Sequence, residues 1–221
     1  MLGTGCVSLV MARRGDACIL EHASSHHDLG EEGAMHMVHA ARYWVVADLD
    51  DLPNDGNRYE VIDGELLVTP APTMDHQEAL MQLLLRLRPY TQAQKIGNVV
   101  FAPADVTFSP KRGVQPDLFV VPLHRGRRPR SFPEVGHLLV AVEVLSPSTA
   151  RSDRVKKRRV YREEGVEEYW IIDLDARTIE RSTPQDDRVE VIDDSLTWKP
   201  AGATEAFVLD LDEYFKAVLD E

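Results

Sequence analysis

The sequence predicts an α/β protein of the α+β kind, with a mixed central β-sheet flanked by helices. Short runs rich in Val, Ile and Leu alternate with two longer segments of helical periodicity. The run LLVAVEVL, residues 138–145, is apolar on both faces, which is typical of a strand in the middle of a sheet. No internal repeat or long low-complexity linker interrupts this order, so the strands are expected to feed helices on the faces of one sheet.

The first part of this domain contains a predicted turn, a hairpin and a helix. Residues 44–53, WVVADLDDLP, indicate a short strand followed by a helical turn. YEVI and ELLV flank Asp63-Gly64, a dipeptide suited to the positive φ angles of a tight primed turn. Residues 71–90 carry leucines at helical spacing after Thr73 or Asp75, either of which can cap the helix.

The second part reads as strands around one more helix. Residues 98–110 predict a strand pair or one bent strand, and 114–122 and 136–147 predict two further strands. The strand that contains Glu143 stops at Ser-Pro-Ser-Thr, because proline cannot continue the ladder and the hydroxyls can cap a helix. The later elements are a helix at 149–165, a strand-turn-strand unit at 166–183 and a closing helix at 209–221.

Composition limits the classes of function. The net charge of −12 and the pI near 5.1 exclude a protein that coats nucleic acid by bulk charge, although one local basic face remains compatible with nucleic-acid contact. No apolar run approaches the roughly 18–20 residues that span a bilayer, so no membrane is expected. The two cysteines lie within the first twenty residues and imply no disulfide framework, which favours a cytoplasmic location.

The N-terminal segment differs from the rest of the chain. Residues 1–34 have weak periodicity and lack the order of a secretory signal. We expect a flexible, disordered leader there, with a short ordered arm as the alternative. A single domain is then expected to cover residues 35–221.

Two acidic residues lie inside apolar strands. Glu143 lies in the middle of LLVAVEVL, and Asp117 follows Pro116 at the start of an apolar strand. A buried carboxylate is costly unless it is paired, protonated or bound to a cation, and a salt bridge to an arginine is the simplest explanation for one such acid. Two acids on neighbouring strands would repel each other unless a cation lay between them, and carboxylate oxygens suit Mg²⁺ or Mn²⁺.

A third candidate residue lies on the following helix. Asp153, Lys157 and Tyr161 have i, i+4, i+8 spacing and therefore share one helical face. A lysine beside metal-bound carboxylates can position an attacking water and offset charge in a phosphoryl transition state. The alternative is a solvated basic helix with internal Asp–Lys pairing.

Two basic stretches are expected near this site. HRGRRPR contains Arg125, Arg127 and Arg128, and RVKKRR contains Lys156 and Arg158. Both could contact phosphates. The alternative is that they offset an otherwise acidic surface.

Pro116-Asp117, Glu143 and a later lysine resemble the PD-(D/E)xK nuclease pattern, with one departure. The usual lysine stands two residues after the second acid, where this chain has Leu145. Longer stretches resemble the Uma-two family of putative restriction endonucleases over about residues 40–215. These stretches are RYEVIDGELLVTPAPTMDHQ, VQPDLFVV, VEVLSPSTARSDRVKKRRVYREEGVEEYWIID and LDARTIE. In that family the lysine has moved to the following helix, and the matching residue here is Lys157.

The resemblance implies a restriction-endonuclease-like core with a Mg²⁺- or Mn²⁺-dependent endonuclease site acting on DNA. Asp117 and Glu143 would hold the metal with the backbone carbonyl of Val144, and Lys157 would orient the nucleophilic water. Secondary candidates are Glu65, His76 and Tyr161. A homodimer is expected by analogy with other nucleases of this fold.

Two other functions stay open on the sequence. The displaced lysine and the acidic composition are compatible with a catalytically inactive nuclease fold that serves as a binding or assembly module. A metal-dependent hydrolase of small phosphodiesters is the third possibility.

Overall fold

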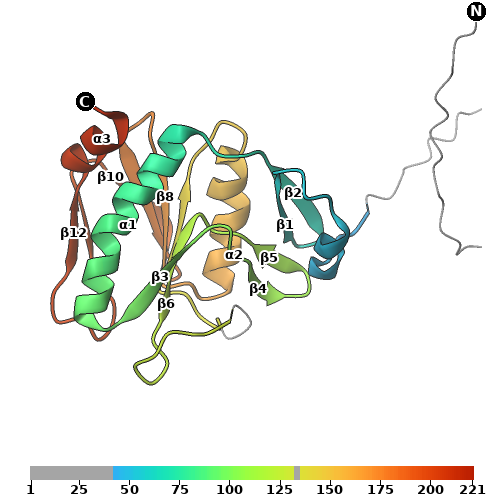
Figure 1. Cartoon of the computed structure of the whole chain (residues 1–221), viewed down its shortest axis with the longest axis horizontal. Helices are drawn as coiled ribbons and strands as arrows, with labels where there is room; N and C mark the ends of the chain where they lie inside the picture. Colours follow the sequence, from blue (N-terminus) through green and yellow to red (C-terminus); the bar gives the residue numbers. More distant parts are fainter. Residues whose placement is uncertain (1–41, 132–134) are drawn as a thin grey trace, which may run out of the picture. The chain divides into compact units, whose positions relative to one another are not determined.

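A six-stranded mixed sheet forms the centre of residues 42–131 and 135–221, the part of the chain that the computed structural model describes (Figure 1). The predicted leader and its boundary at residue 35 lie outside these residues. The strand order is β10-β9-β8-β7-β6-β3. The strands of this sheet are β3 (Gly97–Phe101), β6 (Leu118–Pro122), β7 (Val140–Val144), β8 (Glu168–Asp173), β9 (Thr178–Thr183) and β10 (Asp186–Ile192).

Strand β7 lies inside the sheet, as its apolar sequence predicts. It pairs antiparallel with β6 and parallel with β8, and all five of its residues are buried. Parallel strands need a crossover connection, which is supplied here by the helical segments η3 (Ser152–Lys157) and α2 (Arg158–Glu163). The mixed sheet and the crossover helix confirm the predicted fold class.

The crossover begins with π-helical turns. Residues Ser152–Lys157 form η3, and the helix then continues as α2 with ordinary α-helical geometry. Short π-helical insertions are frequently found at functional sites. Both Asp153 and Lys157 of η3 are buried, so this segment turns charged side chains toward the sheet.

A second sheet of four strands has the order β2-β1-β5-β4. It contains β1 (Arg58–Ile62), β2 (Glu65–Thr69), β4 (Val106–Ser109) and β5 (Arg112–Val114). The turn between β1 and β2 has positive φ at Asp63 (50°) and Gly64 (90°), which confirms the hairpin predicted from this dipeptide. Residues 98–110, predicted as a strand pair or one bent strand, contain two strands, but β3 and β4 belong to different sheets and do not pair with each other.

One local prediction was wrong. Residues 44–46 form no strand; the backbone N–H of Trp44 donates to the carbonyl of Gly64 at 2.9 Å, and Val46 already begins the 3₁₀ helix η1 (Val46–Asp51). A single hydrogen bond to the hairpin turn is not enough to extend the ladder. The helical turn predicted after this segment is η1.

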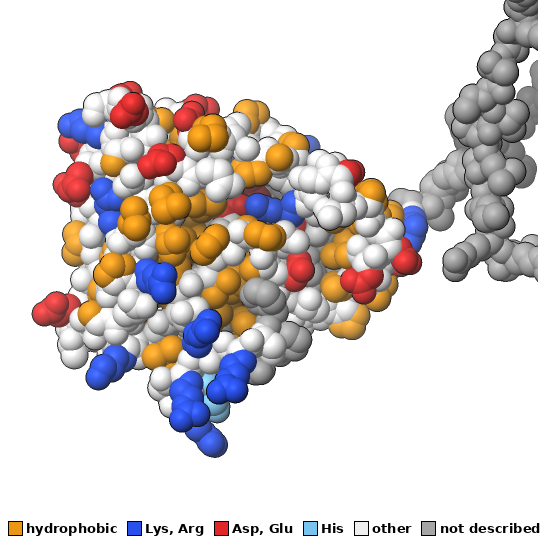
Figure 2. All heavy atoms as spheres, in the orientation of Figure 1, with side chains coloured by type: hydrophobic (Ala, Val, Ile, Leu, Met, Phe, Trp, Pro, Cys, Tyr) orange, Lys and Arg blue, Asp and Glu red, His pale blue; other side chains and the backbone are white. Residues whose placement is uncertain are grey.

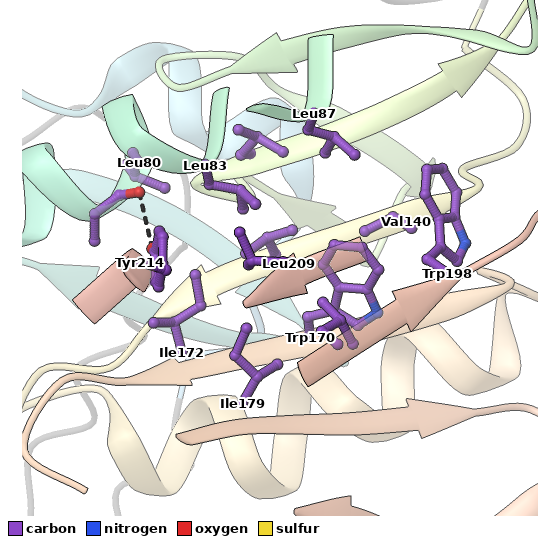
Figure 3. Close-up of a cluster of buried hydrophobic side chains, with 14 of the residues drawn as sticks. Leu80, Leu83, Leu87, Val140, Trp170, Ile172, Ile179, Trp198, Leu209 and Tyr214 are labelled. Atoms are coloured by element: carbon purple, nitrogen blue, oxygen red, sulfur yellow. Dashed lines mark hydrogen bonds between the residues drawn. The ribbon is translucent and has the colours of Figure 1, made fainter. Parts of the chain in front are cut away.

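Two helices cover one face of the six-stranded sheet. Helix α1 (Met74–Gln94) starts at Thr73, whose side chain accepts from the backbone N–H of His76, and α3 (Leu211–Leu219) starts at Asp210. They pack on apolar side chains of β6, β7 and β8 together with the hairpin of β11 (Ser195–Trp198) and β12 (Phe207–Asp210) (Figure 3). Within the described residues, no helix is both long and apolar enough to cross a bilayer.

The other face of the central sheet meets the crossover helix and the second sheet. Phe119, Ala141 and Ile171 point to this face, where Val160 and Tyr161 of α2 pack on them. Because strand residues alternate between faces, Asp117 and Glu143 belong to the same face as Phe119 and Ala141. The sheet therefore directs both embedded acids toward the crossover helix.

Helix α1 offers a matched pair of leucines for testing this packing. Leu83 is fully buried in the core, whereas the side chain of Leu85, two residues later, is 60% exposed. We expect Leu83→Ala to lower the free energy of unfolding by about 2–5 kcal/mol, since it removes buried methyl groups and leaves a cavity. Leu85→Ala should change it by about 0.5 kcal/mol or less. Urea denaturation measures both, and equal losses would contradict the packing of α1.

Candidate functional site

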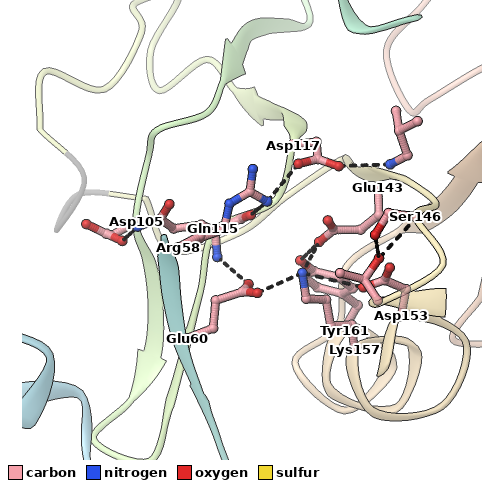
Figure 4. A network of polar contacts seen from close by, with 12 residues as sticks. Arg58, Glu60, Asp105, Gln115, Asp117, Glu143, Ser146, Asp153, Lys157 and Tyr161 are labelled. Carbon is pink, nitrogen blue, oxygen red and sulfur yellow. Dashed lines mark hydrogen bonds and ion pairs between the residues drawn. The ribbon is translucent and has the colours of Figure 1, made fainter. Parts of the chain in front are cut away.

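A cluster of buried charges lies where β1, β6, β7 and η3 meet (Figure 4). Four carboxylates face two cations there. All four acidic residues are 2% exposed or less. We call the following group the buried charge cluster: Arg58, Glu60, Asp117, Glu143, Asp153 and Lys157.

Lys157 stands among three of these carboxylates. Its Nζ lies 3.0 Å from Glu143 Oε1, 3.0 Å from Glu60 Oε2 and 3.6 Å from Asp153 Oδ1. Burial alone would lower the pKa of this ammonium, but the surrounding carboxylates, Glu143 foremost, raise it well above its usual value. Lys157 therefore keeps its proton in this arrangement.

Asp117 is held by three donors. Its Oδ1 accepts from Arg58 Nη1 at 2.7 Å, and its Oδ2 accepts from His76 Nε2 at 3.0 Å and from the backbone N–H of Val144 at 2.9 Å. Burial favours the neutral acid, but the hydrogen bond from His76 and the charge of Arg58 outweigh it and hold the pKa of Asp117 below its usual range. The carboxylate stays ionised.

Glu143 is held on one oxygen only. Its Oε1 accepts from Lys157 Nζ and from the Tyr161 hydroxyl, each at 3.0 Å. Its Oε2 has no recorded hydrogen bond to any described residue. Burial raises the pKa of Glu143 well above its usual value; Lys157 opposes this, and the charges of Asp117 and Asp153 add to it. Tyr161 is also fully buried and its pKa is raised, so its hydroxyl remains a donor.

Glu60 belongs to the cluster and was missed in the sequence. Its Oε1 accepts from the backbone N–H of Gln115 at 2.8 Å, and its Oε2 faces Lys157. The run RYEVI contained the same signal as β7, a glutamate flanked by apolar or aromatic strand residues. Glu60 stands between Tyr59 and Val61 in this way. Arg58 was missed as well, two residues earlier on the same face of β1.

The structure gathers most of the predicted site residues. Asp117, Glu143 and Lys157 share the cluster, and His76 and Tyr161 contact it directly. Glu65 lies apart from it: its side chain is 59% exposed and pairs with Lys156 on the surface. Arg158, the first residue of α2, is partly buried.

The two basic stretches do not both lie near the cluster, contrary to the expectation from the sequence. Asp117 immediately precedes β6, whereas Arg125, Arg127 and Arg128 follow the other end of that five-residue strand. The order of Asp117, strand and basic stretch is visible in the sequence, but the length of the strand keeps its two ends apart.

The basic stretch after β6 has a defined shape. His124 and Arg127 exchange two backbone hydrogen bonds, of 2.8 and 3.0 Å, around Arg125 (φ 50°) and Gly126 (φ 74°), which makes a tight turn. No ion pair to another described residue is recorded for Arg125, Arg127 or Arg128. These arginines line an open cavity of about 830 Å³, and Lys and Arg side chains gather over this loop at the lower edge of the face in Figure 2.

The charge balance of the cluster bears on metal binding. With all four carboxylates ionised, the charges of Arg58 and Lys157 leave an excess of two negative charges. Two carboxylate oxygens of the cluster also accept no hydrogen bond: Glu60 Oε2 and Asp153 Oδ1 are buried and have only the ionic contact with Lys157. Among the described residues, no three His, Cys, Asp or Glu side chains already surround one point as metal ligands do. The donor set nevertheless fits a hard divalent cation in charge and in ligand type.

The fold and this site define a class of protein. A mixed sheet that presents an acid beside one strand, a second acid within the next strand and a lysine from the crossover helix is a restriction-endonuclease-like core. The chain belongs to the Uma2 family, described as "Putative restriction endonuclease", which it matches over residues 46–212. This confirms the resemblance seen in the sequence.

A solved structure has the same fold. It is described as a putative nuclease belonging to DUF820 from Anabaena variabilis ATCC 29413. The two chains are 22% identical with a TM-score of 0.66, and the similarity covers 79% of this chain and 99% of the other. Likeness at this level of identity establishes the fold. No curated protein matches the chain.

The raised pKa values predict an unusual dependence of stability on pH. Burial raises the pKa of Glu143 and Asp153 in the folded protein above the unfolded values of about 4.3 and 3.9. The folded state therefore binds more protons, and the stability this confers is complete below about pH 4 and is lost as pH rises through the folded pKa values. Asp117 has the opposite shift, and its contribution is lost only as pH falls below about 3.9.

We expect the melting temperature in EDTA to fall as the pH rises above about 4, through the raised pKa values of the two acids, and to fall less steeply in Glu143→Gln, which removes one of the titrating acids. Comparing the two proteins cancels the general effect of net charge. Differential scanning calorimetry measures both profiles. Parallel profiles for the wild type and the variant would contradict the raised pKa of Glu143.

Proposed function

We propose that the chain is a divalent-metal-dependent endonuclease that hydrolyses phosphodiester bonds in DNA, with Mg²⁺ or Mn²⁺ as its cofactor. The observation that carries this proposal is the excess of two negative charges in a cluster shielded from water. Such an excess must be met by protons or by a cation, and a divalent ion matches it in both charge and ligand preference.

The metal would be held by Asp117, Glu143 and the backbone carbonyl of Val144. The N–H and C=O of one strand residue point to the same side, and the N–H of Val144 already donates to Asp117. Oε2 of Glu143 is available as a ligand, and Glu60 supplies a further carboxylate beside it. When bound, the ion would lower the pKa of a water molecule and neutralise charge on the phosphate.

Lys157 would act as a hydrogen-bond donor rather than as a base. Its raised pKa keeps Nζ protonated, so it can orient the attacking water and offset negative charge that develops on the phosphate. The lysine is displaced in sequence but not in space, since its Nζ lies 3.0 Å from Glu143. This proximity supports an active nuclease over an inactive binding module.

His76 and Tyr161 would position the two acids. His76 Nε2 fixes Oδ2 of Asp117, and the Tyr161 hydroxyl fixes Oε1 of Glu143. Each of these hydrogen bonds limits the rotation of the carboxyl group that accepts it. Their loss should reduce activity less than the loss of the acids themselves.

Nucleic-acid contacts would come from the basic residues outside the cluster. Arg125, Arg127 and Arg128 form one group on the turn after β6, while Lys156 and Arg158 lie on the crossover helix. Their arrangement would let a local positive surface meet phosphates on a chain that is acidic overall. The homodimer and the cytoplasmic location expected from the sequence stay predictions.

Three single variants separate metal binding from chemistry, and a fourth serves as their control. Asp117→Asn and Glu143→Gln keep size but remove ligand charge, so we expect both to lose Mn²⁺ affinity and cleavage together. Lys157→Ala removes a cation that competes for the same carboxylates. It should keep or increase Mn²⁺ affinity while cleavage drops by about 10²-fold or more, the scale of one preorganised electrostatic group. Calorimetric Mn²⁺ titration and plasmid nicking measure the two effects.

Lys156→Ala is the matched control one residue away. Its side chain pairs with Glu65 on the surface, so cleavage should fall by a few-fold at most. Loss of cleavage in Lys156→Ala but not in Lys157→Ala would show that the wrong lysine has been assigned. Cleavage of a chromogenic phosphodiester without any cleavage of DNA would favour the small-phosphodiester hydrolase.

The turn after β6 that carries Arg125, Arg127 and Arg128, here called the arginine turn, is tested by the salt dependence of cleavage. In the triple variant with Ala at Arg125, Arg127 and Arg128, the slope of log kcat/KM against log salt should become shallower by up to about 2.7, because each phosphate that an arginine neutralises adds about 0.9 to the slope. Mn²⁺ affinity should not change. A control with Ala at Arg86, Arg177 and Arg188 alters net charge equally away from the turn. Equal slopes in the two triple variants would contradict a phosphate-binding role for this turn.

A further inference from the structure

Arg58 is the member of the buried charge cluster that reaches the surface. Its side chain is 16% exposed, whereas the side chains of Asp117, Glu143 and Lys157 are each 3% exposed. It projects from the first residue of β1 and bonds to Asp117 at the edge of the cluster (Figure 4). A molecule that approaches Asp117 from solvent would therefore meet this guanidinium.

Only one of its nitrogens is in use. Nη1 donates to Asp117 Oδ1 at 2.7 Å and to the backbone carbonyl of Gln115 at 3.0 Å. Nε and Nη2 have no recorded hydrogen bond to a described residue. Neither nitrogen is fully buried, so both retain contact with solvent. Three N–H donors are left unused beside the ionised acid.

The position of Arg58 is fixed by backbone rather than by flexible side chains. Arg58 and Glu60 lie two residues apart on β1 and so point to the same face. The carbonyl of Gln115 accepts from Arg58, and the N–H of Gln115 donates to Glu60. One peptide segment thus aligns a cation and a carboxylate of the same cluster.

A guanidinium with a free edge is a ligand for a tetrahedral oxyanion. Arginine presents its donors as a planar fork that matches two phosphate oxygens, and charge-assisted bonds of this kind are among the strongest in proteins. Its charge is secure here, because Asp117 and Glu143 raise the pKa of Arg58 even though burial opposes them. Lysine would offer a single point charge in its place.

We propose that Arg58 is a catalytic residue that binds the two non-bridging oxygens of the scissile phosphate through Nε and Nη2 while Nη1 stays on Asp117. This inference rests on the proposed endonuclease activity and adds to it the group that places the phosphate. The same side chain would then fix the acid and the substrate relative to each other. Neither the PD…E…K pattern nor its helix-borne lysine includes such a residue.

The test compares Arg58→Lys and Arg58→Gln with the matched pair Arg86→Lys and Arg86→Gln. Arg86 is a partly buried arginine of α1 that pairs with Gln82 and Glu213 outside the cluster. We expect Arg58→Lys, which keeps the charge but not the fork, to lower kcat/KM on DNA by about 10²-fold. In Arg58→Gln the slope of log kcat/KM against log salt should also become shallower by about 0.9, the value for one phosphate. Both Arg86 variants should match the wild type.

Mn²⁺ titration separates phosphate binding from a merely structural role. Arg58→Gln removes a cation beside Asp117, so its Mn²⁺ affinity should equal or exceed that of the wild type while cleavage falls. If Mn²⁺ affinity and cleavage fell in parallel, Arg58 would only orient Asp117 and the proposal would be wrong. An unchanged kcat/KM and salt slope in an active Arg58→Gln would also overturn it. A wild type that cleaves no DNA with any divalent ion would instead refute the proposed function, and the role of Arg58 with it.

Discussion

The contact between the Lys157 ammonium and its carboxylates is the interaction on which the rest of the site depends. Removing six charged groups from water is expensive, and the cost is offset only where opposite charges meet at hydrogen-bond distance. Strand β1 brings Glu60, β7 brings Glu143 and η3 brings Asp153 to a single Nζ. The π-helical start of the crossover, the second sheet and the end of β7 must all meet at this point for the charges to be tolerated.

Burial gives the two key acids different properties. Both lie on one face of one sheet, yet Asp117 receives three donors and stays ionised, while Glu143 shares its cation with Glu60 and Asp153 and is pushed toward the protonated form. The site therefore couples proton binding to any cation that enters it. Buried carboxylates that repel one another lower the stability of the fold, and such a loss of stability is expected at functional sites.

Much of the fold and part of the site could be predicted from sequence, for identifiable reasons. Asp117 and Glu143 stood out because each interrupts an otherwise apolar strand, and Lys157 because helical spacing joins it to Asp153. The Asp63-Gly64 hairpin and α1 followed from turn chemistry and leucine spacing. Glu60 was missed although it interrupts the run RYEVI, because Arg58 two residues earlier gives β1 an alternation that is equally typical of a solvated face.

Other features could not be read from the chain. Strands β10, β11 and β12 mix polar with apolar residues, and their pairing partners become evident only in the structure. Six residues of π-helix cannot be separated by pattern from a stretch of α-helix. The loop with Arg125, Arg127 and Arg128 was expected near the site, although β6 separates it from Asp117.

Long sequence separation within the cluster has a consequence for how activity arises during folding. Arg58 and Asp117 are 59 residues apart, His76 and Asp117 are 41 apart, and Lys157 follows Glu143 by 14 through a crossover helix. Contacts between residues this far apart in sequence form only when the loops between them have closed. A partly unfolded chain would hold the acids of the cluster but not their arrangement, so the proposed nuclease site would exist only in the completed fold.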